Sequence, residues 1–578
     1  MLEELHTASS LLRAALERYV NACSSLHNAC LYKSSISSAT EILSSVSNEL
    51  GLVENYKGEL THVQVVVKRV RNALADVPIN SLPPEVLTHI FHIVLSQQPC
   101  PFQASGPSSL NNPARMLKYP DTFTHVCSRW RQIALTSPGL WSHLDISPAC
   151  LFDRRLHNRA EAYITRACQT PLDIHFIDTG ICRQTESPPT DRDDSNSEEE
   201  ISEFEDGSDN WSDRDSDDAV YNKNPRKFQL LSFSTKPHIR SLGLLAHHEY
   251  NHINSRALAC FLAICSTQGL SELVIDVPSR TLSTPAFIET CSNSDNRAIT
   301  TFPRLSLSEQ QLERAWHSVK FLNLKGIYPR WTSAAYQGLT DLRLLGKRNI
   351  TTSELTGILM LSPRLRILRC DFWVGESSQP DAPISPVTLD HLEVLDLGEM
   401  SDTSLAHFLP WLNPGPTPLR LSLRCNPTST RLKDFFERSN VQELRIASSK
   451  RTIFDPLLPP DMFCLPSQLR VLALIGWDWN VIFAHRGIVS RSGGKPHPVQ
   501  LETLYMIDCC YDNFSQFRAT VEHYSPQKLI LHDCYGVYAE MKYSIDALED
   551  IYQSKTSEIC PSVQHLTRKN PIPLQDWN

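Results

Sequence analysis

Four short phrases of the sequence decide the fold: LTDLRL (339–344), LRILRC (365–370), LEVLDL (392–397) and LRLSL (419–423). In each phrase apolar residues alternate with others, which is the pattern of a short strand with one buried face. Their central leucines recur at intervals of 26, 27 and 26 residues. A repeat of this size is typical of units that have no core singly and share a continuous one when stacked. The phrases therefore predict a repeat array.

Further copies of the phrase extend the array in both directions. They are IRSLGL (239–244), LSELVI (270–275), VKFLNL (319–324), VQELRI (441–446), LRVLAL (469–474), LETLYM (501–506) and a weaker LILHD (529–533). Phrase and period resemble leucine-rich repeats, and the resemblance implies an irregular α/β solenoid, or horseshoe, over residues 230–540. We expect a degenerate unit or an inserted loop in the wide gap between 273 and 322. Residues 541–578 are interpreted as a C-terminal cap and tail.

Residues that alternate with the inward leucines should line the concave face of the predicted sheet. This strip leans basic in its middle and becomes apolar toward the C-terminal end. Arginines on an exposed strand are often merely solvated. The alternative is that they bind an acidic or phosphorylated segment of a protein substrate through bidentate pairs. The candidate substrate-binding residues are Arg343, Arg369, Arg420, Arg424, Arg445 and Tyr505.

A different pattern precedes the array, in PINSLPPEVLTHIFHIVL (78–95) and THVCSRWRQIALTSPGLW (124–141). Proline is compatible with the first turn of a helix, and Glu85 is favourable near a helix N-terminus. The apolar residues that follow cover a broader face than a short, isolated helix can bury. Two short helices are therefore expected, separated by a proline-rich loop over residues 96–120.

Residues 78–147 resemble an F-box, through the ordered pattern L-P-x-E-hydrophobic, I-F, V-C-x-x-W-R and L-W. The long loop departs from the short turn usual in that family. With the preceding helices, the segment looks like F-box proteins of mushroom-forming (basidiomycete) fungi. The resemblance implies a three-helix unit that docks on a Skp-type adaptor, which connects it to a cullin. The residues it implies for adaptor binding are Leu82, Pro83, Glu85, Leu87, Ile90, Phe91, Val126, Cys127, Trp130 and Leu140.

Residues 1–76 are predicted to form a helical hairpin similar to a coiled coil. Apolar residues recur at spacings of three and four from Leu2 to about Leu31, and again from Ser38 to about Leu74. Gly51 and Gly58 weaken the second helix. The apolar stripes must be buried on each other, on the next domain, or on a second copy of the chain. Residues 148–183 are either a connecting segment or a first repeat-like unit.

An acidic segment accounts for the net charge of −9. Residues 191–218 carry fourteen Asp or Glu against two Arg, so the rest of the chain sums to +3. A segment this polar cannot offset the entropy of ordering, and residues 184–222 are predicted to be a disordered linker. Because the segment is strongly negative, we also consider that it lies over the arginine strip and blocks it.

The sequence contains no G-x-S-x-G, H-E-x-x-H or phosphate-binding loop, and no catalytic constellation is predicted. His247, His248 and His252 lack a matched cysteine or carboxylate pattern, so no metal or other cofactor is expected. Cys260, Cys265, Cys509 and Cys510 are interpreted as buried thiols. No secretory leader or membrane span is predicted, and no nucleic-acid partner, which favours a cytoplasmic or nuclear protein. The preferred hypothesis is a non-catalytic substrate receptor of an SCF-type ubiquitin ligase; the alternative is an interaction scaffold without a role in ubiquitination.

Overall fold

The computed structural model describes the chain in two compact units, Met1–Leu87 and Thr88–Asn578. The description leaves out residues 1, 33–38, 75–77, 98–119, 149–153, 179–236, 248–249, 266–268, 279–285, 291–303, 376–384, 399, 425–429, 449–464, 478–499, 512–513, 539–540, 545–558 and 567–578. The predicted acidic linker and most of the predicted proline-rich loop lie outside the described residues. The boundary between the two units falls within one helix.

The first unit is helical. It contains α1 (Leu2–Tyr32), α2 (Ala39–Leu74) and the four-residue α3 (Pro78–Ser81). The two long helices confirm the prediction from apolar spacing, although Pro78 starts a short helix of its own. α2 continues through both glycines, because each costs only about 1 kcal/mol in a long cooperative helix. Side chains along both helices remain exposed, including Leu11 at 68% and Leu50 at 64%.

The helix α4 (Pro84–Ser96) spans the boundary between the units. Pro84 occupies its first position, where the missing N–H would have had no intrahelical partner. In the second unit it is followed by α5 (Asp121–Val126), α6 (Ser128–Leu135) and the 3₁₀ turn η2 (Pro138–Trp141). At the N-terminus of α6, the Cys127 sulfur accepts a hydrogen bond from the Trp130 N–H at 3.4 Å. The predicted short helices are therefore present on both sides of the loop.

In the described part of the second unit, a parallel sheet of fourteen strands forms the body. Its strands follow chain order: β1 (His143–Ile146), β2 (Leu172–Asp178), β3 (Ile239–Ala246), β4 (Glu272–Asp276), β6 (Phe321–Lys325), β8 (Asp341–Leu345), β10 (Ile367–Cys370), β13 (Val394–Asp396), β15 (Leu419–Leu423), β16 (Val441–Ala447), β17 (Val471–Ile475), β18 (Thr503–Ile507), β20 (Lys528–His532) and β23 (Ser562–Leu566). The eleven leucine phrases give β3 to β20. The strands β1 and β23 were not predicted, and β2 lies in residues 148–183, which were predicted to be either a connecting segment or a first repeat-like unit.

The leucines of the phrases form one buried row across the sheet. Strand pairing brings Leu342 beside Leu368, Leu368 beside Leu395, and Leu395 beside Leu421. Each of these four leucines has no exposed surface. The row continues with residues that are at most 1% exposed: Leu242, Leu273, Leu322, Leu444, Leu472, Leu504 and Leu529. The alternation of the sequence therefore sets the register, because a shift of one residue would expose the whole row.

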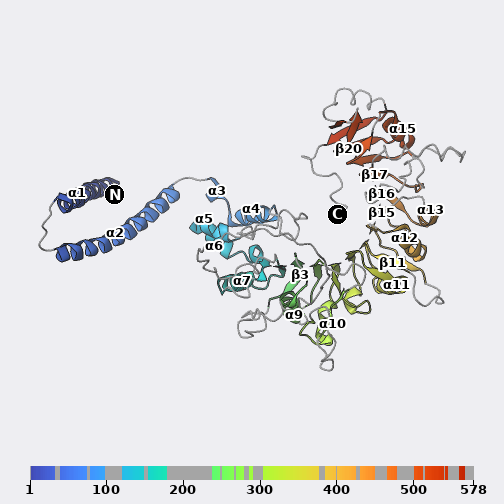
Figure 1. The fold of residues 1–578 in the computed structure, drawn as a ribbon, viewed down its shortest axis with the longest axis horizontal. Helices are drawn as coiled ribbons and strands as arrows, with labels where there is room; N and C mark the ends of the chain where they lie inside the picture. The colour runs from blue at the N-terminus through green and yellow to red at the C-terminus, as the bar shows by residue number, and fades with distance from the viewer. Residues whose placement is uncertain are drawn as a thin grey trace, which may run out of the picture. The chain divides into compact units, whose positions relative to one another are not determined.

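Helices lie along one side of this run of strands (Figure 1). They are α7 (Arg154–Ala167), α9 (His252–Cys265), α10 (Glu309–Trp316), α11 (Thr352–Met360), α12 (Asp402–Phe408), α13 (Thr430–Arg438) and α15 (Phe514–Tyr524), with 3₁₀ turns η6 (Ala334–Tyr336) and η7 (Leu409–Trp411). Reciprocal capping boxes at Ser308 and Thr351 start α10 and α11. Among the described residues, no helix is long and apolar enough to cross a membrane.

The segments between the main strands contain short strands that form small sheets of two or three strands. These are β5 (Ala286–Phe287) with β7 (Ile327–Tyr328), β9 (Asn349–Thr351) with β11 (Trp373–Gly375), β12 (Val387–Leu389) with β14 (Leu412–Pro414), and β19 (Cys510–Tyr511) with β21 (Tyr535–Tyr538) and β22 (Met541–Ser544). In the main sheet β4 pairs directly with β6. The wide gap between 273 and 322 is therefore an insertion, which contains β5 and α10, and adds no strand to the main sheet.

Candidate functional site

The cluster formed by α4, α5 and α6 has an aromatic core in the second unit. The rings of Phe91 and Phe123 stack with centroids 4.3 Å apart, and Trp130 lies 4.8 Å from Phe91. The Trp141 indole N–H donates to the carbonyl oxygen of Ala134 at 2.8 Å. Trp141 has no exposed surface. The tryptophan pair of the sequence thus holds the short helices together.

Three residues of the predicted adaptor-binding set are buried. Leu87 and Phe91 have no exposed surface, and Leu140 is 2% exposed. Their side chains are enclosed by the chain itself. The apolar spacing of the sequence identifies side chains that need burial, but it does not distinguish burial in the chain from burial on an adaptor.

Other members of the predicted set do reach the surface. Pro83, Glu85 and Val126 are exposed, and Leu82, Ile90, Cys127 and Trp130 are partly exposed. Two apolar residues of α4 that the prediction did not include, Val86 and Ile93, are 41% and 43% exposed. Val86, Ile90 and Ile93 recur at spacings of four and three, and so lie on one side of that helix.

The second candidate surface is the face of the main sheet opposite to the buried leucine row, here called the far face. Its residues alternate with the buried leucines along each strand. One row of this face, read by strand pairing, contains Asp145, His175, Gly243, Val274, Asn323, Arg343, Arg369, Asp396, Ser422, Arg445, Ala473 and Tyr505. The structure therefore aligns Arg343, Arg369, Arg445 and Tyr505 of the predicted substrate-binding set. Arg420 lies in the neighbouring row, opposite Glu443.

Two of the predicted arginines already have acidic partners in the sheet. Arg343 forms a bidentate pair with Asp341, at 3.0 and 2.9 Å, and its guanidinium lies over the Phe321 ring. Arg420 lies 3.1 Å from a carboxylate oxygen of Glu443. Because a guanidinium held in this way has fewer donors to offer, these two residues are less available to a ligand than expected.

Arg369 and Arg445 also interact with neighbouring groups, and Asp396 lies near both, but their electrostatic environment is different. Burial, followed by the positive charge of Arg343, lowers the pKa of Arg369, while Asp396 and Asp341 oppose the change. Burial likewise lowers the pKa of Arg445, against the effect of Asp396. Arg424, which is exposed, adds a like charge near Arg445. An anion placed here would reduce this repulsion, as Asp396 already does in part.

The apolar end of the strip is less open than predicted. Ala473 has no exposed surface and Ile507 is 6% exposed, although both alternate with the core residues of their strands. Ile475 and Tyr505 pack against them and are partly buried. Burial, followed by the negative charge of Glu443, raises the pKa of Tyr505. This end of the far face is thus a small apolar cluster with one phenol.

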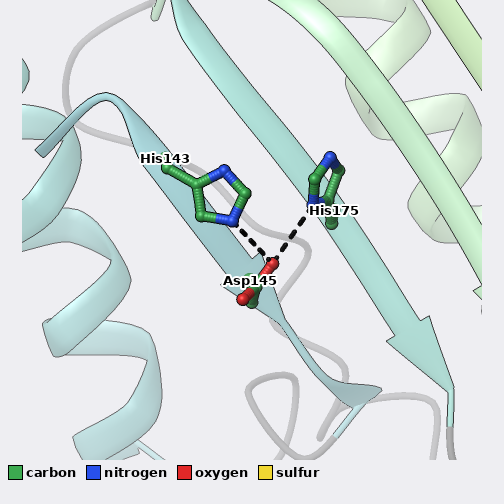
Figure 2. Close-up of side chains that lie close together, drawn as sticks. All are labelled: His143, Asp145 and His175. Carbon is green, nitrogen blue, oxygen red and sulfur yellow. Dashed lines mark hydrogen bonds and ion pairs between the residues drawn. The ribbon is translucent and has the colours of Figure 1, made fainter. Parts of the chain in front are cut away.

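At the opposite end of the same row, His143 and Asp145 of β1 meet His175 of β2 (Figure 2). His143 Nε2 and His175 Nδ1 each lie 3.2 Å from the same oxygen, Asp145 Oδ1. Burial alone would raise the pKa of Asp145, but the hydrogen bonds and charges of the two histidines outweigh it and hold the pKa well below its usual range. The sequence predicted none of these three residues as a site.

The cluster is a possible cation site by donor type and spacing. Its three ligand atoms all lie within 4.8 Å of one another, and no other group of three or more His, Cys, Asp or Glu among the described residues meets that test. His247 and His252 do not join such a group, and His248 lies outside the described residues. Cys265, Cys509 and Cys510 are buried thiols and Cys260 is partly buried, in line with the interpretation from sequence.

Comparisons with known proteins do not assign the chain to a family. The sequence matches no protein-family model, and no curated protein is significantly similar to it.

Proposed function

We propose that this chain is a non-catalytic substrate-recognition subunit of an SCF-type E3 ubiquitin ligase, acting in the cytoplasm or nucleus. In this proposal residues 78–147 act as an F-box on a Skp-type adaptor, and the sheet acts as an irregular leucine-rich-repeat solenoid that binds a protein target. The proposal rests on the F-box-like pattern at α4–η2, followed by the parallel sheet with its leucine row. Such a receptor carries out no bond chemistry and holds the target near the conjugating enzyme.

The exposed apolar residues of the short helices support the adaptor contact. Ile93 is 43% exposed and Val126 is 54% exposed. Covering apolar surface on a partner is favourable by about 25 cal/mol per Å². The buried Leu87, Phe91 and Leu140 then act indirectly, by fixing the helices that present these side chains.

The far face supports recognition of an acidic or phosphorylated segment. Its central row combines half-buried arginines that repel each other with an aromatic residue farther along, at Tyr505. Arginine binds carboxylate and phosphate groups through paired hydrogen bonds, which become stronger when water is excluded. Arg369 and Arg445 are the residues we expect to contribute most to target binding.

Co-purification of the full chain with a Skp-type adaptor and a cullin tests the proposal. Ile93→Glu combined with Val126→Glu should weaken adaptor binding at least about tenfold, because two apolar contacts become buried charges. Met360→Glu is the matched control, since Met360 is a 48% exposed apolar residue of α11. Binding that survives the double variant, or is lost equally in the control, would contradict the proposed docking surface.

The alternative is an interaction scaffold that binds proteins without directing ubiquitination. The far face suits this function equally well, because it needs only a protein ligand. A chain that binds a target but recruits no cullin would favour the scaffold. In either case the exposed apolar residues of α1 and α2 favour self-association through residues 1–76.

A further inference from the structure

We propose that His143, Asp145 and His175 form a binding site for a divalent cation of the zinc class, which links β1 to β2. The inference is independent of the proposed function, because it rests on the donor atoms and the geometry at this end of the sheet. The ion would take one ligand atom from each residue, and water would complete its coordination.

Two of the three donor separations fit a tetrahedral ion, and the third lies within 4.8 Å. With bonds of about 2.0–2.1 Å, two ligands of a zinc ion lie roughly 3.3–3.4 Å apart. Two of the three separations, from Asp145 Oδ1 to His143 Nε2 and to His175 Nδ1, are 3.2 Å. The two imidazole rings meet at 77° with centroids 4.8 Å apart, so they are not stacked on each other. Small movements of the side chains would place the ion between the three atoms.

The fold itself holds the ligands in place. His143 and Asp145 are two residues apart on β1 and therefore project from the same face, while strand pairing puts His175 beside Asp145. The next residue of β2 on this face, Asp173, forms a bidentate pair with Arg240 at 3.0 and 2.6 Å. Asp173 is thus engaged elsewhere, which leaves these three residues as the ligands that the described part of the chain offers the ion.

Burial defines the open side of the site. The side chains of Asp145 and His175 are 5% and 12% exposed, whereas that of His143 is 35% exposed. An ion can therefore enter from the side of His143, and solvent can reach the remaining coordination position there. A site with three protein ligands and one open position is a recurrent zinc arrangement.

The donor set selects the class of cation. Magnesium and calcium prefer oxygen ligands throughout, and copper(I) prefers sulfur, whereas two imidazoles and a carboxylate suit zinc and its neighbours in the first transition row. Binding requires lone pairs at His143 Nε2 and His175 Nδ1, so the ring protons that face Asp145 must move to the other ring nitrogen or leave. The carboxylate then faces the cation in place of the two N–H groups.

The test is zinc binding to the full chain, measured by titration calorimetry after treatment with a chelator. We expect one zinc ion per chain, with affinity reduced at least about 100-fold by Asp145→Asn or His175→Asn, because even changes behind the ligands cost 10–100-fold. His391→Asn, at an exposed position outside the cluster, is the matched control and should bind zinc like the wild type. Equal affinity in all four proteins would overturn the proposal.

X-ray absorption at the zinc edge of the loaded wild-type chain is a second measurement that does not depend on the variants folding. The chain has seventeen cysteines, which are the main competitors for zinc. A first shell of nitrogen and oxygen with two imidazoles supports the proposed site. Sulfur in the first shell, or no bound zinc, overturns it.

Discussion

Residues with special backbone geometry limit which substitutions the sheet tolerates. Gly326 connects β6 to β7 with φ +94°, and a Cβ built on it would lie 2.0 Å from the carbonyl oxygen of Val277. The contact is with backbone, which cannot rotate away as a side chain can. Gly357, within α11, has no atom within 4 Å of the same position. Position 326 therefore requires glycine, whereas position 357 has room for a larger side chain.

Gly326→Ala should destabilise the second unit by about 2–4 kcal/mol, from the clash and the unfavourable φ together. Gly357→Ala should be neutral or stabilising by up to about 1 kcal/mol, because alanine is the better helix former. Denaturant unfolding of both variants measures the difference. Similar stabilities for the two proteins would show that the close approach at Val277 is not a real constraint.

The candidate site residues show what single positions can and cannot reveal. His143 and Asp145 are two residues apart, but His175 follows thirty residues later, and no local pattern connects them. Only the pairing of β1 with β2 brings the three together. Leu87 and Phe91, in contrast, are prominent in the sequence because they are apolar and regularly spaced, and the same property places them in the interior.

At the scale of elements, local signals predicted the two long N-terminal helices, the short helices on either side of the proline-rich loop, and eleven strands of the main sheet. The leucine phrases predicted strands because their alternation extends over five or six residues. The apolar alternation of β1 covers only four residues. In β2 polar residues occupy alternate positions, but the leucine spacing of the other strands is absent. Both strands are identified by the strands with which they pair, and this pairing cannot be read from their own residues.

The capping box of α10 gives an element-level prediction. Ser308 Oγ accepts a hydrogen bond from the Gln311 N–H at 3.2 Å, and Gln311 Oε1 accepts one from the Ser308 N–H at 3.0 Å. Ser308→Ala should therefore cost about 1 kcal/mol of stability. Ser353→Ala, at an exposed position in the first turn of α11, should change stability by less than about 0.5 kcal/mol. Thermal unfolding of the two variants tests the cap, and equal midpoints would count against it.

At the scale of the whole molecule, the exposed apolar side chains of α1 and α2 predict self-association. Leu16 is 45% exposed and Val53 is 40% exposed. Replacing both with Glu in the full chain should shift the molecular mass measured by light scattering from dimer or higher to monomer. Met360→Glu serves again as the control for an added surface charge. A wild-type chain that is monomeric at micromolar concentration would refute the prediction.

The far face gives a second whole-molecule prediction. Arg369→Gln with Arg445→Gln should weaken binding of an acidic or phosphorylated peptide at least about tenfold, since each charged hydrogen bond contributes roughly 1.5–3 kcal/mol. Arg470→Gln removes an exposed arginine that pairs with Glu502 and should have little effect. Fluorescence anisotropy with a labelled peptide measures both. An equal loss of peptide affinity in the double variant and in the Arg470→Gln control would indicate that only the net charge of the chain determines binding.

The order of the main sheet has a consequence for how the protein opens. Among the described residues, every strand of the main sheet pairs with its neighbours in chain order, and β1 and β23 each have one neighbour in that sheet. Local unfolding should therefore begin by fraying at these two margins and proceed inward one strand at a time. Amide hydrogen exchange should accordingly be fastest at the margins and slowest near β10 and β13. A cation held between β1 and β2 would slow exchange at the first margin alone.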